Sequence, residues 1–194
     1  MDAALDAAIQ VFWRQGYEGT TLDDLTTAMT ISRPSLYAAF GGKEATFKAA
    51  VTRYAQVDML YVETALAQPT ALAVATTYLH GNVRTITNPD RPPGCLTVQG
   101  GVSGSRADQP IVDFLNTVRV DVQTRLTTRF ERAIADGDLP ATEDPADLAR
   151  YLLTVSSGQA IQAGAGATRT QLSRVAERAL AAFRGLAQPP GAER

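Results

Sequence analysis

The chain has 194 residues, of which 45% are hydrophobic and 20% are charged, and its formal net charge is −2. These values predict a folded globular protein without a chain-wide excess of basic residues, so a nucleic-acid-binding surface would have to be local. The single cysteine excludes an intramolecular disulfide, and no apolar run approaches the roughly 18 residues of a membrane span. The acidic N-terminus is unlike a secretory signal, so we expect a cytoplasmic protein with no membrane partner. Alanine is abundant and β-branched runs are scarce, which predicts an all-α fold of about nine helices.

Three short helical patterns follow one another closely at the N-terminus. Apolar residues at three- and four-residue steps predict a helix over 2–16. Thr21 is suited to cap a second helix of about two turns, and Ser32 is suited to cap a third of similar length. A tight turn at residues 30–31 separates these two helices, and a pair of glycines ends the third.

The rest of the chain predicts longer helices. A fourth helix begins at Lys43 and is expected to run as far as Gln68, just before Pro69. The strongest apolar periodicity lies over 111–134. Further helices are expected over 70–87, 95–102, 145–163 and 169–187. We find no internal repeat and no strand pattern.

The second and third patterns have the dimensions of a helix-turn-helix unit, whose second helix can enter the DNA major groove. Leu36 and Phe40 form the packing face of the third helix. Ser32, Arg33 and Ser35 are then free to face DNA near its N-terminus. An arginine there can reach a guanine edge or a phosphate, and serine hydroxyls suit either. Pairs of short helices also occur in all-α proteins that bind no nucleic acid, so both interpretations stay open.

Lys43 stands at the start of the fourth helix, where a positive charge is mildly unfavourable against the helix dipole. The position becomes favourable when the lysine and the exposed backbone N–H groups bind a phosphate together. Basic residues outnumber acids from Ile31 to Tyr54, whereas the charged residues within 1–30 are mainly acidic. We interpret Lys43 as a contact to the DNA backbone.

Two stretches, Phe12–Leu25 and Ile31–Glu44, resemble the DNA-binding domain of TetR-family transcriptional regulators. The Gly-Tyr, Thr-Thr, Leu-Tyr-x-x-Phe and Lys-Glu positions carry this resemblance, which spans about residues 2–54. It implies a homodimeric, ligand-responsive regulator, usually a repressor, that binds a palindromic double-stranded DNA operator. By position, the resemblance implies phosphate contacts from Thr21 and Tyr37, a recognition face of Ser32, Arg33, Ser35 and Ala38, and a backbone contact from Lys43.

Two features depart from the family pattern. The turn glycine that is common in the family is Thr30 here, which predicts strain in the turn. The basic arm that often precedes the first helix is absent. We therefore expect either that the protein makes no minor-groove arm contact or that its true start lies upstream.

We expect a helix-turn-helix DNA-binding domain over 1–46 and an effector-binding and dimerisation domain over 47–194. The second region more weakly resembles one branch of the same family, through Pro93–Leu96 and Ala135–Leu139. Apolar stripes on the last two helices predict a homodimer interface, although such stripes also fit an ordinary core. The predicted interface residues are Leu152, Ser156, Leu172, Val175, Ala179 and Phe183.

Polar and aromatic groups on otherwise apolar segments predict a pocket for an unidentified small-molecule effector among the middle helices. The candidates are Tyr61, Tyr78, His80, Arg84, Cys95, Gln99, Phe114 and Gln159. Each is a weak signal by itself, since aromatic residues on helices usually belong to the core and Arg84 also suits a position facing solvent.

Cys95 follows a Pro-Pro-Gly loop and is expected to open a helix, where the helix dipole favours a thiolate. This position supports an alternative function, a redox or electrophile sensor, beside the simpler interpretation of a small buried hydrophobe. A helical enzyme is a weaker alternative, because the sequence has no phosphate-binding loop, no metal-ligand spacing and no cofactor motif. A constitutive DNA-binding module and a structural interaction protein also remain open.

Overall fold

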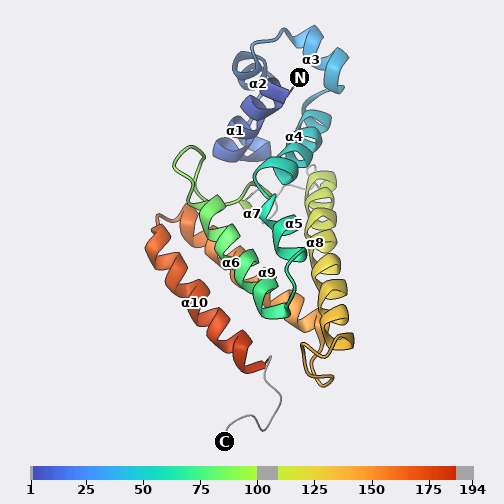
Figure 1. Cartoon of the computed structure of the whole chain (residues 1–194). Helices are drawn as coiled ribbons and strands as arrows, with labels where there is room; N and C mark the ends of the chain where they lie inside the picture. The colour runs from blue at the N-terminus through green and yellow to red at the C-terminus, as the bar shows by residue number, and fades with distance from the viewer. Residues whose placement is uncertain (1, 100–108, 187–194) are drawn as a thin grey trace, which may run out of the picture.

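Every element that the structure describes is an α-helix, in a computed structural model that covers residues 2–99 and 109–186 (Figure 1). This confirms the all-α prediction. The described residues contain ten helices rather than about nine: α1 (Asp2–Gly19), α2 (Leu22–Met29), α3 (Arg33–Phe40), α4 (Lys43–Val57), α5 (Tyr61–Leu66), α6 (Ala71–Ile86), α7 (Leu96–Gln99), α8 (Gln109–Ala135), α9 (Pro145–Gly164) and α10 (Arg169–Leu186).

The molecule is elongated, with α1 to α3 at one end and the long helices α6, α8, α9 and α10 at the other (Figure 1). Helix α4 passes between the two parts. It packs on α1 on one side and contacts α7 and α8 on the other. The predicted domain boundary between residues 46 and 47 therefore falls inside a continuous helix, and that boundary stays a prediction.

The expected helix from Lys43 to Gln68 is wrong, because the structure divides it into α4 and α5. Asp58 ends α4 and turns its side chain into the protein, where it meets Arg91 of the loop after α6. The separate direction of α5 lets Val62 and Ala65 become buried. Helix propensity favours continuation through these residues, so only the tertiary contacts explain the break.

Two other expected helix ends also differ. Gly16 does adopt a left-handed φ of 73°, but it forms a kink and helical structure resumes as far as Gly19. The short helix expected over 95–102 is α7, which begins at Leu96 and is described only as far as Gln99. Residues 100–102 of that expected helix, and residue 187 of the expected helix over 169–187, lie outside the described residues.

The end of the molecule formed by α1 to α4 has its own aromatic core. The rings of Phe12 and Phe47 meet edge to face with centroids 4.9 Å apart, and Tyr17 packs on Phe47 at 5.2 Å. Leu25 of α2 and Leu36 of α3 are fully buried against this core. Their burial fixes which face of α3 points inward, and so which face is left for solvent or DNA.

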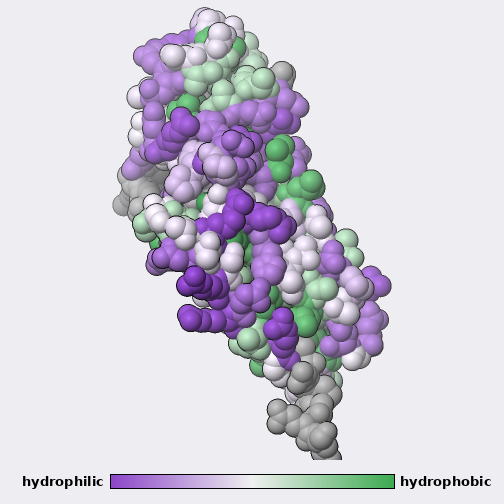
Figure 2. Space-filling model, turned by 60° about the vertical axis from the view of Figure 1, so that its left-hand side comes forward, coloured by the Kyte–Doolittle hydropathy of each residue, from purple (hydrophilic) through white to green (hydrophobic). Residues whose placement is uncertain are grey.

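The surface of the molecule is mostly polar on the face shown in Figure 2, where hydrophobic side chains occur in small scattered groups. Within the described parts of the chain, no helix combines the length and the apolar character needed to span a bilayer.

Candidate nucleic-acid interface and effector cavity

Helix α2 begins with a reciprocal capping box. The backbone N–H of Asp24 donates to the Thr21 hydroxyl at 3.1 Å, and the Thr21 N–H donates to the Asp24 carboxylate at 2.8 Å. The hydrogen bond from the Thr21 hydroxyl also lowers the pKa of the Asp24 carboxyl. This arrangement holds the start of α2 at an exposed position where the family resemblance implies a phosphate contact.

The turn between α2 and α3 depends on a left-handed residue. Thr30 has φ 56° and ψ 44°, and its N–H closes α2 by donating to the Thr26 and Thr27 carbonyls. It is the only non-glycine with positive φ among the described residues. Because a β-branched side chain fits poorly in this region, the predicted strain has a structural basis here.

Helix α3 lies at the far end of the molecule from α9 and α10 (Figure 1). Ser32 caps the helix, because its hydroxyl accepts from the Ser35 N–H at 3.2 Å. Leu36 is buried, whereas the predicted recognition residues Ser32, Arg33, Ser35 and Ala38 and the predicted phosphate contact Tyr37 are all exposed. All five are therefore accessible, and their roles stay predictions.

Arg33 is held by an acid in this structure. Its Nε and Nη2 atoms donate to Oδ1 of Asp23 at 3.0 and 2.8 Å. Both side chains are largely exposed, so water screens the pair and it is worth little to stability. A phosphate or a base edge can therefore compete with Asp23 for the guanidinium.

Lys43 lies at the first position of α4, next to the α1–α2 corner. Its Nζ is 4.4 Å from the centroid of the Tyr17 ring and 3.4 Å from the Glu18 carbonyl oxygen. The preceding residue, Gly42, provides no side-chain cap. The first N–H groups of α4 therefore lie beside a lysine, which is the combination that binds phosphate.

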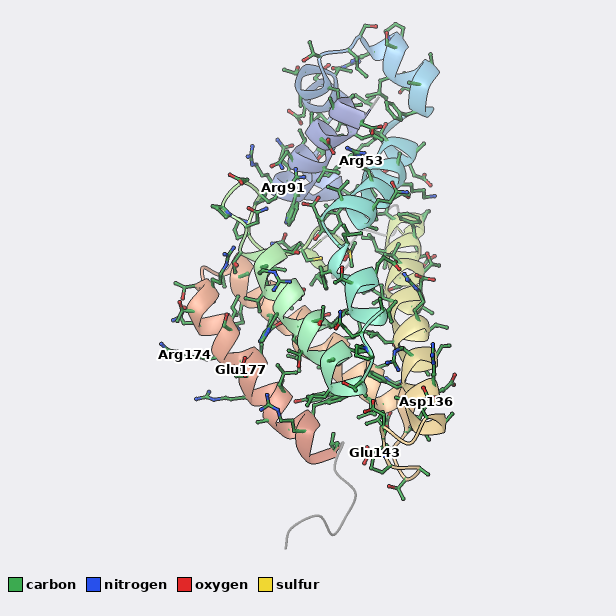
Figure 3. The ribbon with its side chains drawn as sticks, in the orientation of Figure 1. Arg53, Arg91, Asp136, Glu143, Arg174 and Glu177 are labelled. Atoms are coloured by element: carbon green, nitrogen blue, oxygen red, sulfur yellow. The ribbon has the colours of Figure 1, made fainter. Side chains whose placement is uncertain are left out.

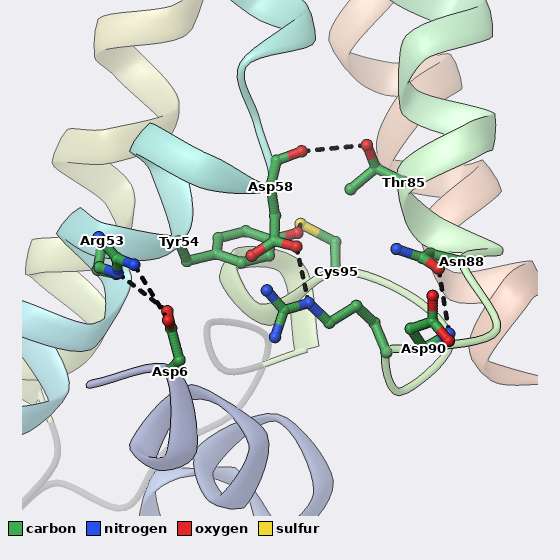
Figure 4. A network of polar contacts seen from close by, with 9 residues as sticks. Asp6, Arg53, Tyr54, Asp58, Thr85, Asn88, Asp90 and Cys95 are labelled. Carbon is green, nitrogen blue, oxygen red and sulfur yellow. Dashed lines mark hydrogen bonds and ion pairs between the residues drawn. The ribbon is translucent and has the colours of Figure 1, made fainter. Parts of the chain in front are cut away.

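The C-terminal end of α4 forms ion pairs with α1 and with the loop after α6 (Figure 4). Arg53 donates to both carboxylate oxygens of Asp6 in α1, at 2.9 and 3.0 Å, and to Asp2 at 2.9 Å. Asp58, at the C-terminal end of α4, accepts a hydrogen bond from Nε of Arg91 at 2.9 Å. Figure 3 places Arg53 and Arg91 at the level where α1 meets the rest of the chain.

The two carboxyl groups at this joint have opposite pKa shifts. The hydrogen bond from Arg53 lowers the pKa of Asp6. Burial raises the pKa of Asp58, and the nearby Arg91 only partly offsets this effect. Oδ2 of Asp58 is buried and has no hydrogen-bond partner among the described residues. The surroundings of Asp58 thus disfavour the charged form of its carboxyl group.

Tyr54 connects α4 to a cavity in the second part of the molecule. Its buried hydroxyl donates to Sγ of Cys95 at 3.3 Å, and burial raises the pKa of this phenol well above its usual range. Cys95 in turn forms part of the cavity wall and lies 3.1 Å from the Thr97 hydroxyl.

The cavity has a volume of about 30 Å³. It is lined by Met59, Tyr61, Tyr78, Asn82, Cys95, Thr97, Val98, Val118, Arg119, Val122, Leu153, Ser156, Ser157 and Ala160. Asn82 organises its polar side, accepting from the Tyr61 hydroxyl at 3.3 Å and donating to Oε1 of Gln159 at 2.9 Å. Burial raises the pKa of Tyr61 well above its usual range and that of Tyr78 to about 12, so both phenols are neutral.

Three of the eight predicted pocket residues line this cavity, namely Tyr61, Tyr78 and Cys95. Gln159 lies behind the wall and supports Asn82. The other four lie elsewhere: His80 pairs with Glu177 at 2.8 Å, Arg84 is exposed, Gln99 bonds to the Pro93 carbonyl, and Phe114 lines an open groove between α4, α5 and α8.

The prediction of pocket residues missed Asn82, Arg119 and Ser156, which are polar members of the cavity lining. Asn82 occurs one turn before Ile86 on the buried side of α6, and a polar residue within such an apolar stripe is a usable signal. Arg119 gave no signal, because arginines also occupy the solvent-facing side of α8 and only the fold separates them.

The predicted dimer residues are mostly buried within the single chain. Leu152, Ser156, Leu172, Ala179 and Phe183 have almost no exposed surface, and Ser156 lines the cavity. Val175 is 43% exposed, and Ile161 on α9 is 53% exposed. The apolar side chains that α9 and α10 offer to a partner are therefore mainly different from those predicted, and the interface itself stays a prediction.

The burial of Cys95 does not favour the sensor alternative. The residue precedes a four-residue helix, and its sulfur is enclosed by the Tyr54 and Thr97 hydroxyls. A small buried group with two polar neighbours is an ordinary structural cysteine. In the described residues, no cluster of His, Cys, Asp and Glu side chains is arranged to hold a metal ion.

Comparison with known proteins agrees with the geometry of the N-terminal end. The family described as "Bacterial regulatory proteins, tetR family" matches residues 4–50. The HTH-type transcriptional repressor ComR of Escherichia coli (strain K12) is 32% identical over 178 residues, which cover 90% of this chain and 84% of ComR.

Solved structures extend the similarity over nearly the whole chain. A cysteine-substituted form of the TetR family transcriptional regulator CifR, complexed with 26-base-pair double-strand operator DNA, is 39% identical with a TM-score of 0.89. The alignment covers 94% of this chain and 96% of that one. A putative TetR transcriptional regulator from Rhodococcus sp. RHA1 is 40% identical with a TM-score of 0.63, covering 96% and 98%. The chain therefore belongs to the TetR family of DNA-binding transcriptional regulators and is not an enzyme.

Proposed function

We propose that this protein is a homodimeric repressor that binds a palindromic operator and is released from it by a small-molecule effector in the cytoplasm. The similar protein ComR is named as a repressor, and the structure of the similar protein CifR is that of a complex with double-strand operator DNA. On this proposal, Thr21, Tyr37 and Lys43 contact phosphates. Ser32, Arg33, Ser35 and Ala38 face the bases.

The observation that carries the proposal is the span of α4. This helix begins with Lys43 at the DNA-facing end, and its last turns bind the cavity wall through the Tyr54–Cys95 contact. A helix of 15 residues is about 22 Å long and is stiff, so a displacement of its C-terminal end moves its N-terminal end. An effector that prefers the displaced arrangement would weaken operator binding by its differential affinity for the two states.

Selection of bound sequences from a random DNA pool tests the proposal directly. We expect a palindrome whose half-sites lie about one helical turn apart, since a twofold dimer presents two copies of α3. The selected DNA then serves for fluorescence anisotropy with Arg33→Ala. This variant should weaken binding. It should also reduce the difference in binding free energy between bases at one position of each half-site by about 1–3 kcal/mol. A selected sequence with a single unrepeated site would contradict the dimeric proposal.

A further inference from the structure

Among the described residues, one side chain brings formal charge to the cavity wall. It is Arg119, and the other described lining residues are apolar or neutral polar. Tyr61 and Tyr78 are neutral because burial raises their pKa values, and the amide and hydroxyl groups beside them carry no formal charge. A small cleft with low-dielectric walls and one positive group favours an anion.

Arg119 keeps donors available for a ligand. Its Nη1 donates to the Thr97 carbonyl at 2.9 Å, and its Nη2 donates to Oδ1 of Asn116 at 2.5 Å. Both acceptors are neutral, and no carboxylate pairs with Arg119 among the described residues. A guanidinium has five N–H donors, so three have no acceptor among residues 2–99 and 109–186, and a carboxylate is the group that fits them in a two-pronged hydrogen bond.

Arg119 differs in this respect from the other arginines of α8. Arg125 pairs with Glu63 at 2.6 Å, and Arg132 pairs with Asp136 at 3.4 Å. Arg129 donates to two backbone carbonyls outside the cavity, at Gln68 and Pro69. Among the arginines of α8, only Arg119 combines a place on the cavity wall with neutral partners, so a charged ligand gains there an ion pair that the described part of the chain does not supply.

The remaining walls favour a short hydrocarbon chain beside the anion. The apolar lining residues are Met59, Val98, Val118, Val122, Leu153 and Ala160. A multiply charged ion such as phosphate would leave charge against these side chains, whereas an aliphatic tail would bury apolar area. The volume of about 30 Å³ admits only a few atoms. Met59 has a flexible side chain that can move to enlarge the space.

We propose that the cavity binds a small aliphatic monocarboxylate, with its carboxylate on Arg119 and its hydrocarbon chain against the apolar wall. This assignment rests on the proposed ligand response, because it names the chemical class of the effector. The carboxylate would bind donors of Arg119 that Thr97 and Asn116 leave unused. Thr97 also neighbours Cys95, so the ligand would lie beside the contact to α4.

The test uses the full-length protein with acetate, propionate and butyrate, and with the three corresponding primary amides, at constant ionic strength. Binding is measured by titration calorimetry and by the rise in Tm that follows from ligand linkage. We expect the acids to bind and the amides to bind about tenfold more weakly or not at all, because the amides lack the charge.

The variants separate a specific site from a general ion effect. Arg119→Gln should weaken binding of the acids about tenfold or more, and Arg119→Lys, which keeps the charge, should retain part of it. Arg132→Gln is the matched control, since Arg132 is exposed on the same helix and away from the cavity. Equal binding of acids and amides, acid binding by Arg119→Gln within twofold of wild type, or no binding of any acid would each overturn the assignment.

Operator binding, followed by anisotropy in the same solutions, distinguishes a failure of the ligand assignment from a failure of the proposed ligand response. If the acids bind through Arg119 but leave operator affinity unchanged, the ligand assignment stands and the proposed ligand response fails. If operator binding is intact while no acid binds, the ligand assignment fails and the DNA-binding function stands.

Discussion

At the scale of single residues, Thr30 joins α2 to α3 in a conformation that suits glycine. Replacement by glycine should remove roughly 1 kcal/mol of strain and raise Tm by about 2–4 °C in a chain of this size. Differential scanning calorimetry measures the change. Thr27→Gly is the control, because Thr27 is exposed inside α2 and glycine there should lower stability by a few tenths of a kcal/mol. A Thr30→Gly protein no more stable than wild type would show that the turn is unstrained.

Lys43 is expected to act on DNA of every sequence. Lys43→Gln should weaken binding to operator and random DNA by similar factors, because a phosphate contact carries no sequence information. The slope of log K against log salt should become shallower by about 0.9 for each lysine lost. Anisotropy titrations over a range of salt concentrations give this slope. Lys48→Gln, which removes a lysine bonded to Glu44 at 2.6 Å, provides a comparison. An unchanged slope for Lys43→Gln would show that Lys43 does not contact a phosphate.

Asp23 is expected to restrain Arg33 in the protein without DNA. Asp23→Asn removes the acid that holds the guanidinium at 2.8 Å and lowers the negative charge facing the DNA. We therefore expect tighter operator binding, by several-fold at low salt, with little change in Tm, since an exposed pair stabilises the fold by less than about 1 kcal/mol. The double variant Asp23→Asn with Arg33→Ala should lose this gain. An equal gain with and without Arg33 would mean that only net charge matters.

At the scale of elements, the contact between the end of α4 and the loop after α6 depends on the buried ion pair of Asp58 with Arg91. Removal of either charge is expected to change stability by a different amount. The side chains of Asp58 and Arg91 are only 7% and 19% exposed. Arg91→Gln leaves a buried carboxylate without its counter-charge and should lower the free energy of unfolding by about 2–3 kcal/mol. Asp58→Asn removes the charge that burial disfavours, so it should change stability by less than about 1 kcal/mol at neutral pH. Urea unfolding of both variants measures the difference.

The pH dependence of the same joint has a definite sign. Burial raises the pKa of Asp58 in the folded state above the ordinary aspartate value of 3.8. The folded state therefore binds this proton more readily than the unfolded state. Consequently, the contribution of Asp58 to the free energy of unfolding falls as pH rises from 3.8 to the higher folded pKa, and stays low above it. In Asp58→Asn this decline should be absent from urea titrations at several pH values, and a wild-type curve without it would contradict the shift.

At the scale of the whole molecule, the dimer is expected to form through exposed side chains of α9 and α10 rather than through their buried stripes. Ile161 is 53% exposed on α9, and Val175 is 43% exposed on α10. Ile161→Arg should shift the protein to monomers and weaken operator binding strongly, because a monomer holds one half-site only. Light scattering after size exclusion measures the mass.

Leu60→Arg is the matched control for this experiment. Leu60 is a 57% exposed apolar residue, but it lies at the α4–α5 turn, away from α9 and α10. The control should remain a dimer with the wild-type affinity. A dimeric Ile161→Arg, with circular dichroism that matches wild type, would place the interface elsewhere.

The sequence by itself determined that the chain is all-α and where α2 and α3 are capped, because these features depend on neighbours along the chain. Thr21 and Ser32 cap α2 and α3 as predicted, and the apolar spacing of α3 exposes Arg33 and Ser35. The family followed from the same local pattern and is confirmed by the comparisons.

Only the tertiary structure decided which residues meet across the chain. The break between α4 and α5 follows from the pairing of Asp58 with Arg91, which are 33 positions apart. Arg119 faces a cavity while Arg132 on the same helix is exposed, and the apolar stripes of α9 and α10 are filled by their own chain. Periodicity shows that a helix has an apolar face, but whether that face meets another helix of the same chain, a ligand or a second subunit depends on packing in three dimensions.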